Sequence, residues 1–203
     1  MSKLYGDGHR TLQRQFDTER LADRLEERLC RDHITDEDRA FIERLDMFFL
    51  ATADAQGRPN CSYKGGDPGF VRVLDRTTLA FPNYDGNGMY LSMGNALENP
   101  NVGLLFIDFE SQKRLRLNGA ARIAPIAAAP VSFPEAQFVV IVTAREVFPN
   151  CPRYIHKLQL IERSRFVPRP AVPTPVPNWK RSEWARDVLP AGDPAREPPG
   201  PER

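Results

Sequence analysis

The stretch from Phe81 to Asp108 constrains the fold of this chain more than any other part. It reads FPNYDGNGMYLSMGNALENPNVGLLFID, two apolar strand-like runs separated by a Gly/Asn-rich turn and a short helix. The turn, residues 84–88, holds two glycines, which reach positive φ at little cost and leave backbone N–H groups unshielded. A helix start directly after such a turn favours close approach of an anion. The stretch therefore predicts β structure with an anion-binding turn built into it.

Apolar runs elsewhere in the chain predict further strands with short connections. Asp54-Ala55-Gln56-Gly57 is a turn with glycine in the position that needs positive φ. A helix is expected over residues 91–98, and it must end before Pro100 because proline disfavours helix in the residue before it. The expected strands are 47–52, 60–64, 71–74, 78–81, 102–109, 114–123 and 137–147. Many strands with few helices indicate a mainly β fold, a closed or sandwiched sheet of about six strands.

Helices are expected ahead of the strands. Residues 1–17 are polar and are expected to be loose, whereas Leu21, Leu25 and Leu29 recur every four residues and mark one face of a helix.

A second helix is expected to begin at Thr35. Thr35 and Asp38 have the spacing of an N-terminal capping box, although aspartate is a weaker partner in it than glutamate. Ala40, Phe41 and Leu45 follow and are expected to form the buried stripe of this helix.

The composition changes after Val167, since ten of the 19 prolines lie in residues 168–203. Such a stretch is not expected to form a core of its own and should run extended over a surface. Trp179 and Trp184 are costly to leave in water, so we expect them to anchor this tail on the barrel or on a partner subunit, rather than to be incidental in a disordered tail. The expected organisation is an N-terminal extension with a helix (1–34), a β domain (35–166) and a proline-rich tail (167–203).

Charge and cysteine content exclude several functions. The net charge of +1 offers no electrostatic case for nucleic acid or an anionic membrane as the main partner. The three cysteines are too few and too scattered for a disulfide framework, which favours the reducing cytoplasm. The longest apolar run, Phe138 to Val142, is too short to span a bilayer, and the N-terminus has no apolar signal core. We therefore expect a soluble cytoplasmic protein.

Several polar residues close in sequence could hold a phosphate. Ser62 and Lys64 alternate on one expected strand and therefore project to the same face. Asn83 and Asn87 flank the glycine turn ahead of the expected helix. Hydroxyl, amide and ammonium donors are what a phosphate dianion needs. By themselves these residues leave two interpretations open, because a strand's solvent face and ordinary tight turns would use the same residue types.

Longer motifs carry a resemblance to a known family. In order and spacing, seven motifs across about residues 35–160 resemble the pyridoxamine 5'-phosphate oxidase-like, FMN-binding split-barrel family. They are Phe48-Phe49-Leu50-Ala51-Thr52, Asp54-x-x-Gly57-x-Pro59, Lys64-Gly65-Gly66, Leu79-Ala80-Phe81-Pro82, Glu98-Asn99-Pro100, Val102-Gly103-Leu104-Leu105-Phe106 and Leu117-x-Gly119-x-Ala121.

The resemblance implies a split β-barrel that forms a homodimer with FMN bound at the subunit interface. It implies an FMN-dependent oxidoreductase acting on a small molecule, in which the flavin performs the redox chemistry and the protein positions it. Carried onto this chain, the positions that hold the phosphate and ribityl chain are Ser62, Tyr63, Lys64, Phe81, Pro82, Asn83, Asn87, Gly88 and Met89.

The chain departs from the vitamin B6 oxidase proper at the phosphate contacts. That enzyme has an arginine on the second strand, where this chain has Ser62, and an Arg-Lys pair in the phosphate loop, where this chain has Gly86 to Met89. Lys64 remains as a cation, with Arg116 or Arg145 as further candidates. The resemblance is therefore to an uncharacterised subfamily, and the substrate is not expected to be pyridoxamine phosphate.

Three other ligand hypotheses remain open. A haem-binding split barrel would need a histidine placed to ligate iron, but His9, His33 and His156 all lie outside the expected strands. A non-enzymatic dimer that binds flavin or a B6 phosphate would use the same residues without turnover. The deazaflavin F420 has a long anionic tail and would need a wider basic groove than this near-neutral chain offers.

Two cysteine motifs carry weaker signals. Cys151 is followed by Arg153 and His156, which could lower the pKa of its thiol, but a small buried hydrophobe in a proline-rich loop is the more common role. Cys30-x-x-His33 has no second pair at a suitable spacing, so we expect no metal site there.

Overall fold

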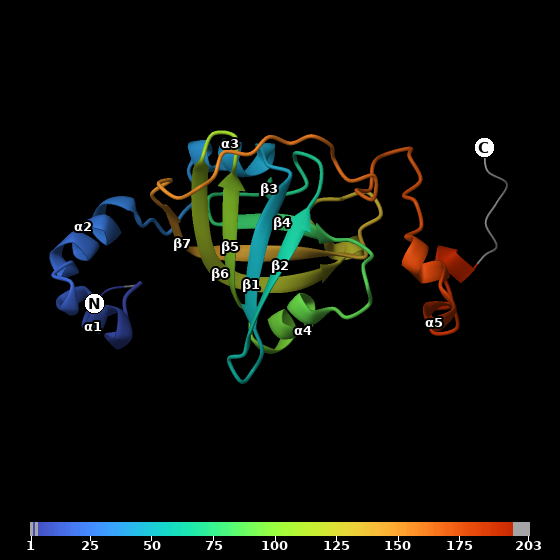
Figure 1. Ribbon diagram of the computed structural model, residues 1–203, viewed down its shortest axis with the longest axis horizontal. Coiled ribbons are helices and arrows are strands. Elements are labelled where there is room, and N and C mark those ends of the chain that lie inside the picture. Colours follow the sequence, from blue (N-terminus) through green and yellow to red (C-terminus); the bar gives the residue numbers. More distant parts are fainter. Residues whose placement is uncertain (1, 3, 197–203) are drawn as a thin grey trace. The chain divides into compact units, whose positions relative to one another are not determined.

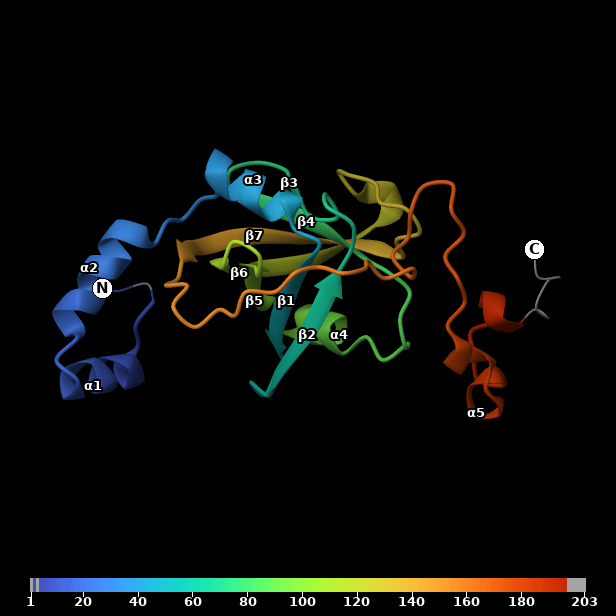
Figure 2. The same ribbon diagram turned by 45° about the horizontal axis from the view of Figure 1, so that its top comes forward.

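The computed structural model describes residues 2 and 4–196. The chain divides into two compact units, Met1–Leu160 and Ile161–Arg203. The N-terminal unit holds the sheet and the helices α1 to α4, and the C-terminal unit holds short helical turns (Figures 1 and 2). No helix among the described residues is long and apolar enough to cross a membrane.

Seven antiparallel strands form one twisted sheet in the order β2-β1-β5-β6-β7-β4-β3. The edge strands β2 and β3 are not paired with each other in the described structure, so the sheet curls without closing and forms a split barrel (Figure 2). All the expected strands form, seven rather than about six, and the predicted mainly β fold is confirmed. The strands are β1 Met47–Ala53, β2 Pro59–Gly65, β3 Arg72–Val73, β4 Thr78–Asn83, β5 Asn101–Asp108, β6 Lys113–Pro125 and β7 Phe138–Pro149.

The core explains why β7 is apolar at successive positions. Val140 and Val142 enter the main core, where the Phe48 ring lies 5.1 Å from that of Phe81. The intervening Val139 and Ile141 face a second, smaller cluster, which residues 126–136 cover with the short helix η1 (Ile126–Ala128). Because both faces of β7 are buried, the alternation typical of a half-exposed strand is absent.

A β-bulge bends the long β6–β7 pair. The register shifts between Asn118 and Gly119. A Cβ atom on Gly119 would lie 2.2 Å from the backbone oxygen of Thr143, closer than any real contact. Glycine is therefore required at this position by the close approach of two backbones.

Helix α3 (Asp36–Arg44) begins as predicted. Thr35 Oγ1 accepts a hydrogen bond from the Asp38 backbone N–H (3.1 Å), and the Asp38 carboxylate accepts one from the Thr35 N–H (3.0 Å), which confirms the capping box. The expected buried stripe is wrong in part. Ala40 is exposed, whereas Phe41 packs against the core and Ile42 is fully buried with Leu45, because the buried face follows positions 38, 41, 42 and 45.

An ion pair ties α3 to the sheet. Arg44 Nη1 donates to Asp108 Oδ2 at 2.7 Å, and Ser111 Oγ donates to the same oxygen at 2.6 Å. Burial alone would raise the pKa of Asp108, but the hydrogen bonds from Ser111 and Arg44 outweigh it and hold the pKa at about 2. The charged form of this carboxylate is therefore stabilised in the fold.

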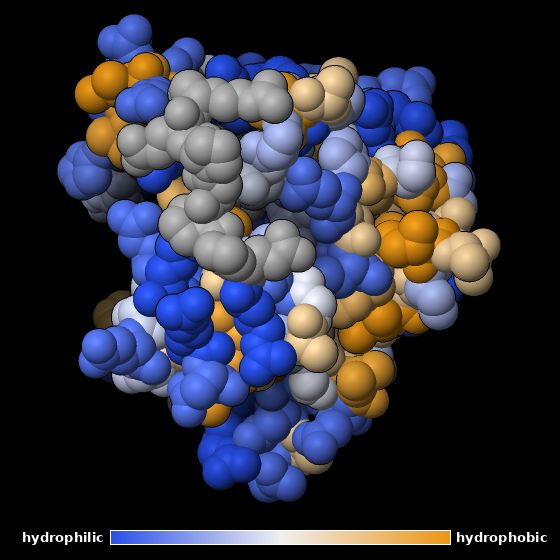
Figure 3. Space-filling view, turned by 90° about the vertical axis from the view of Figure 1, so that its right-hand side faces the viewer, coloured by the Kyte–Doolittle hydropathy of each residue, from blue (hydrophilic) through white to orange (hydrophobic). Residues whose placement is uncertain are grey.

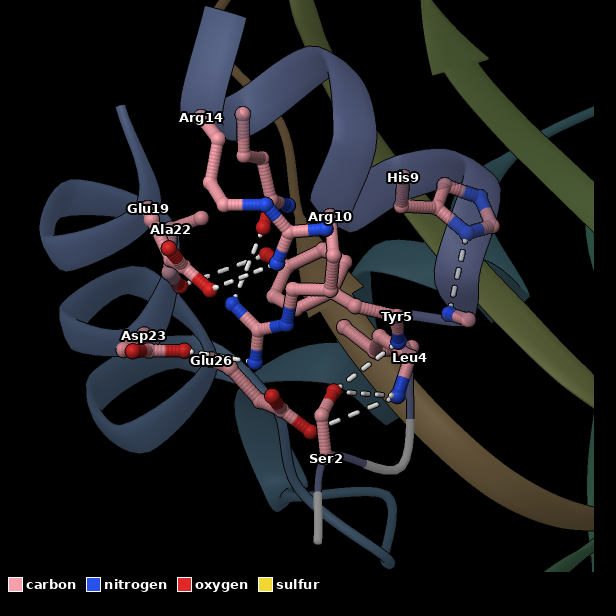
Figure 4. Close-up of polar contacts among 12 residues, drawn as sticks. Ser2, Leu4, Tyr5, His9, Arg10, Arg14, Glu19, Ala22, Asp23 and Glu26 are labelled. Carbon is pink, nitrogen blue, oxygen red and sulfur yellow. Dashed lines mark hydrogen bonds and ion pairs between the residues drawn. The ribbon is translucent and has the colours of Figure 1, made fainter. Parts of the chain in front are cut away.

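The N-terminal segment is helical where it was expected to be loose. Helix α1 spans Asp7–Gln15 and packs against α2 (Glu19–Leu29), the helix predicted from the spacing of Leu21, Leu25 and Leu29. Figure 4 shows the contacts that join them: Arg10 pairs with Asp23 at 2.7 Å, and Tyr5 donates to the Ala22 carbonyl at 3.3 Å. These polar contacts, made between residues far apart in sequence, were not visible in the local pattern of residues 1–17.

The C-terminal unit forms a small core of its own, contrary to expectation. Its elements are η2 (Asn178–Arg181), α5 (Glu183–Arg186) and η3 (Pro194–Arg196). Lys180 and Asp193, both buried, form an ion pair of 2.7 Å, and Ala185 is 1% exposed. The core of this unit therefore combines one buried ion pair with the buried apolar residues Ala185, Leu189 and Ala195.

The two tail tryptophans stack on each other within this unit. Their ring centroids lie 6.0 Å apart, with the planes 16° from parallel, and Trp184 remains 72% exposed. Hydrophobic groups are visible between hydrophilic ones on the face drawn in Figure 3. The docking of the tail on the barrel or on a partner stays a prediction.

Candidate functional site

A cleft of about 240 Å³ lies between β2, the end of β4 and the loop that leads into α4 (Leu91–Glu98). Figure 1 shows α4 beside β1 and β2 at this side of the sheet. None of the residues that line the cleft is acidic, and most offer hydrogen-bond donors. They are Asn60, Ser62, Lys64, Asn83, Tyr84, Gly86, Asn87, Gly88, Met89, Tyr90, Leu91, Ser92 and Met93.

Strand β2 contributes Asn60, Ser62 and Lys64, which share one face because side chains alternate along a strand. Lys64 is half-buried, and burial lowers the pKa of its ammonium group. Within the described chain it forms no ion pair and no side-chain hydrogen bond. A partly desolvated cation without a counter-charge is costly, so an anion in the cleft would stabilise it.

Two serine hydroxyls meet at the floor of the cleft. Ser62 Oγ and Ser92 Oγ lie 2.9 Å apart, and Asn60 Nδ2 donates to Ser92 Oγ at 3.1 Å. Only one of the two hydroxyl protons can form the hydrogen bond between the serines. The other proton has no acceptor among the described side chains, so one serine is free to donate to a ligand.

The start of α4 is open towards the cleft. Tyr90 occupies the N-cap position with φ of 48°, and no side chain caps the first N–H groups of the helix. The first turn, which includes Ser92 and Met93, lines the cleft. Asn87 Oδ1 accepts a hydrogen bond from the Met89 N–H at 3.0 Å, which leaves the amide hydrogens of Asn87 as further donors. A helix start with unsatisfied N–H groups attracts negative charge.

A hydrogen-bond network joins two residues that line the cleft, Asn83 and Tyr90, to Gln137. Gln137, just before β7, accepts from Asn83 Nδ2 at 2.9 Å and from Tyr90 Oη at 3.0 Å. Asn83 Nδ2 also donates to the Tyr84 carbonyl at 3.2 Å, so both amide hydrogens of Asn83 are engaged within the protein. Burial, with smaller effects of Asp67 and Glu135, raises the pKa of Tyr84 to about 12, so its phenol is neutral at physiological pH.

The predicted cofactor residues divide into two groups. The cleft brings together the side chains or backbones of Ser62, Lys64, Asn83, Asn87, Gly88 and Met89. Three others do not line it. Tyr63 lies on the opposite face of β2 with its ring 6.2 Å from that of Phe49, Phe81 is 1% exposed in the core, and Pro82 is buried in β4.

The two additional arginine candidates also lie outside the cleft lining. Arg145 donates to the Asn101 side chain at 2.7 Å and to the Gly119 carbonyl at 3.1 Å. Arg116 is exposed on β6, opposite Leu105 and Phe148. Lys64 is therefore the one cationic side chain among the residues that line this cleft.

Seven residues that line the cleft are not in the predicted set: Asn60, Tyr84, Gly86, Tyr90, Leu91, Ser92 and Met93. Asn60 lies two residues before Ser62 on the same strand, so the alternation that places Ser62 and Lys64 on one face also predicts Asn60 there. Ser92 follows the glycine turn by four residues, but its contact with Ser62, 30 residues away in sequence, depends on the fold. Tyr90 and Gln137 meet only in three dimensions, since they are 47 residues apart.

Histidine and cysteine positions bear on the other ligand hypotheses. His9 Nδ1 accepts from the Gly6 N–H, His33 contacts Asp32, and none of the three histidines lines the cleft. Cys151 is exposed, which corrects the expectation of a buried hydrophobe. The described residues contain no group of three or more His, Cys, Asp or Glu that could hold a metal ion.

Comparisons with known proteins test to which family the chain belongs. The model of the pyridoxamine 5'-phosphate oxidase family matches residues 34–154 of this chain. No curated protein matches it. The solved structures that are similar to part of the chain include the following three.

A provisionally assigned pyridoxamine 5'-phosphate oxidase from Lactobacillus delbrueckii is 27% identical, with 58% of this chain and 95% of that one covered and a TM-score of 0.45. HupZ from Group A Streptococcus is 23% identical, with 57% and 93% covered and a TM-score of 0.46. HutZ, the heme storage protein from Vibrio cholerae, is 19% identical, with 57% and 93% covered and a TM-score of 0.41.

The family match spans well over half of the 203 residues and contains the whole sheet and the cleft. The motifs quoted from the sequence lie within the matched range, and the fold is the open, antiparallel split barrel that they predict. The chain belongs to the pyridoxamine 5'-phosphate oxidase-like, FMN-binding split-barrel family.

Proposed function

We propose that the cleft between β2 and α4 binds FMN by its phosphate, and that the protein is an FMN-dependent oxidoreductase acting on a small molecule. The observation that carries this proposal is Lys64, a half-buried cation without a counter-charge in a cleft lined by donors and by no acid. A phosphate dianion supplies the missing charge and accepts hydrogen bonds from several donors at once.

The donor set fits a phosphate ester on chemical grounds. Lys64, one serine hydroxyl, the Asn87 amide and the open N-terminus of α4 are all donors, and they come from separate elements that converge on one cleft. When bound, FMN supplies the electron-transfer chemistry. The chain's own residues hold the phosphate, and Tyr84 and Tyr90 offer apolar ring surface beside it.

The size of the cleft supports a site completed by a second subunit. Pockets that bury a whole cofactor or drug-sized ligand usually enclose about 300–1,000 Å³, whereas this cleft encloses about 240 Å³. One protomer would therefore hold the phosphate and part of the ribityl chain, and a partner protomer would cover the flavin ring. We accordingly propose a homodimer with FMN at its interface.

The rival ligands fit the cleft less well. Haem would lack a histidine ligand among the residues that line it. The longer anionic tail of F420 would need more than the single cationic side chain that lines the cleft. A non-enzymatic dimer that binds flavin or a B6 phosphate would use the same donors, so it is separated from an oxidoreductase by experiment.

The test is the visible absorption spectrum of the purified full-length protein, before and after addition of FMN. We expect a two-banded flavin spectrum, release of FMN on denaturation, and a light-scattering mass of a dimer. Reduction of the bound flavin by NADH or NADPH under anaerobic conditions would support the oxidoreductase. Flavin that dithionite reduces but nicotinamides and small-molecule substrates do not would favour the non-enzymatic dimer. A Soret band, or a colourless protein that takes up no FMN, would refute the flavin proposal.

A further inference from the structure

Tyr90 holds a backbone conformation that ordinary residues avoid. Its φ of 48° lies in the left-handed region, where side chains other than glycine are strained. It also occupies the N-cap position of α4, which Ser, Thr, Asp or Asn usually fill. Strained residues of this kind persist where surrounding contacts determine them and are concentrated at ligand sites.

The side chain of Tyr90 is held away from the helix start. Its hydroxyl donates to Gln137 Oε1 at 3.0 Å, and its ring lies 6.4 Å from that of Phe138. Phe138 is the first residue of β7 and Gln137 directly precedes it, so both contacts come from the entry to a strand of the sheet. They fix the position at which the loop turns into α4.

Gln137 connects both ends of the same loop. Its side-chain oxygen accepts from Tyr90 at the end of the loop and from Asn83 at the start, and its backbone N–H donates to the Asn83 carbonyl at 2.9 Å. A single residue directly before β7 therefore holds both ends of the loop of residues 84–89. Between these anchored ends lies Gly88, with φ of 75°.

We infer that Tyr90 and Gln137 act together as positioning residues, a latch that holds the loop of residues 84–89 in its anion-binding shape and keeps the N-terminus of α4 open to the phosphate. The inference rests on the proposed binding of FMN. Neither side chain needs to touch the phosphate. The latch acts through Asn87 and the first turn of α4, whose donors it aims into the cleft.

Two variants remove the latch with little change in shape. Tyr90→Phe deletes only the hydroxyl, and Gln137→Leu replaces the amide by an apolar group of similar size. Tyr5→Phe, which deletes a hydroxyl hydrogen bond in the α1–α2 pair, and Gln56→Leu, in the β1–β2 turn, are matched controls. FMN and riboflavin affinities are measured by quenching of flavin fluorescence, and amide hydrogen exchange of residues 84–93 is measured on the FMN-free protein.

We expect each latch variant to weaken FMN binding about three- to tenfold, the usual effect of one hydrogen bond, and the double variant to be no worse than the poorer single one. Riboflavin, which lacks the phosphate, should change less than twofold. Exchange of residues 84–93 should become faster in both variants and stay unchanged in the controls.

Unchanged FMN affinity, equal losses for FMN and riboflavin, or additive losses in the double variant would overturn the latch. If the wild-type protein binds no FMN, the proposed function fails, and the exchange data alone decide about the latch. Faster exchange in both variants would support it, and unchanged exchange would overturn it.

Discussion

Replacing Lys64 by alanine is the most direct test of how the cleft recognises its ligand. The substitution removes the one cationic side chain among the cleft residues and leaves the serine, asparagine and helix-terminus donors in place. Since no acid among residues 2 and 4–196 pairs with Lys64, the change leaves no described partner unsatisfied. Its effect should therefore appear in ligand affinity and only weakly in stability.

The magnitude follows from the environment of the ammonium group. Two unit charges 4 Å apart near a protein surface attract by about 4 kcal/mol, most of which is offset by lost hydration. A hydrogen bond to a charged group contributes about 1.5–3 kcal/mol net. At about 1.4 kcal/mol per tenfold, Lys64→Ala should weaken FMN binding by about 10- to 100-fold.

The assay compares FMN with riboflavin by fluorescence quenching, because only FMN carries the phosphate. Riboflavin affinity should change less than threefold in Lys64→Ala. Lys113→Ala, at the exposed start of β6, is the matched control and should leave both affinities unchanged.

The pH dependence provides a second measurement on the same residue. Burial lowers the pKa of Lys64, so the ammonium charge is lost at a lower pH than the usual 10.5. FMN affinity should decline as the pH rises through that lowered pKa, and the decline should be absent in Lys64→Ala. An FMN affinity that survives Lys64→Ala, or an equal loss for riboflavin, would refute the assignment of Lys64 to the phosphate.

Three predictions concern the fold that carries the cleft. Asp108→Asn should lower the free energy of unfolding by about 2 kcal/mol at pH 7. Because the pKa of Asp108 is about 2 in the fold and 3.8 ordinarily, this contribution exists above about pH 4 and disappears as the pH falls towards 2. Urea denaturation from pH 7 to pH 3 should show the variant and wild type converging, and a constant difference would contradict the ion pair with Arg44. Gly119→Ala should cost at least about 3 kcal/mol, because its Cβ would meet the Thr143 oxygen. A melting temperature within about 2–3 °C of wild type, a difference of only about 1 kcal/mol at this chain length, would show that the bulge relaxes. Thr35→Ala should cost about 1 kcal/mol through loss of the α3 cap, again by urea denaturation, and no loss would mean that the cap contributes nothing.

Local signals in the sequence predicted most of the fold. The strand runs, the turn at Gly57 and the capping box at Thr35 each depend on residues within a few positions of one another. The alternation of Ser62 and Lys64 likewise placed both on one face of β2. Such features follow from backbone geometry and nearby side chains, so a single sequence contains them.

Predictions failed where a residue's environment is set by distant parts of the chain. The sequence pattern at Ala40 fits a buried stripe, but the sheet meets α3 on the face of Ile42 instead. Residues 1–17 look loose in isolation, and helix α1 forms with α2 as its packing partner. The composition of the tail predicts no core of its own. In the structure, Lys180 and Asp193 form a buried ion pair within it.

The sequence by itself determined the family, the order of the strands along the chain and the donor residues on β2 and around the glycine turn. Only the tertiary structure decided which of them meet. It placed Tyr63 on the opposite face of β2 from the cleft, enclosed Phe81 in the core, and brought Gln137 to Tyr90 and Asn83. The reason is that the periodicity of a sequence shows which residues share one face of a helix or strand, but not which other element that face meets. The pairing of β4 with β7 joins residues more than 50 positions apart, so no local pattern contains it.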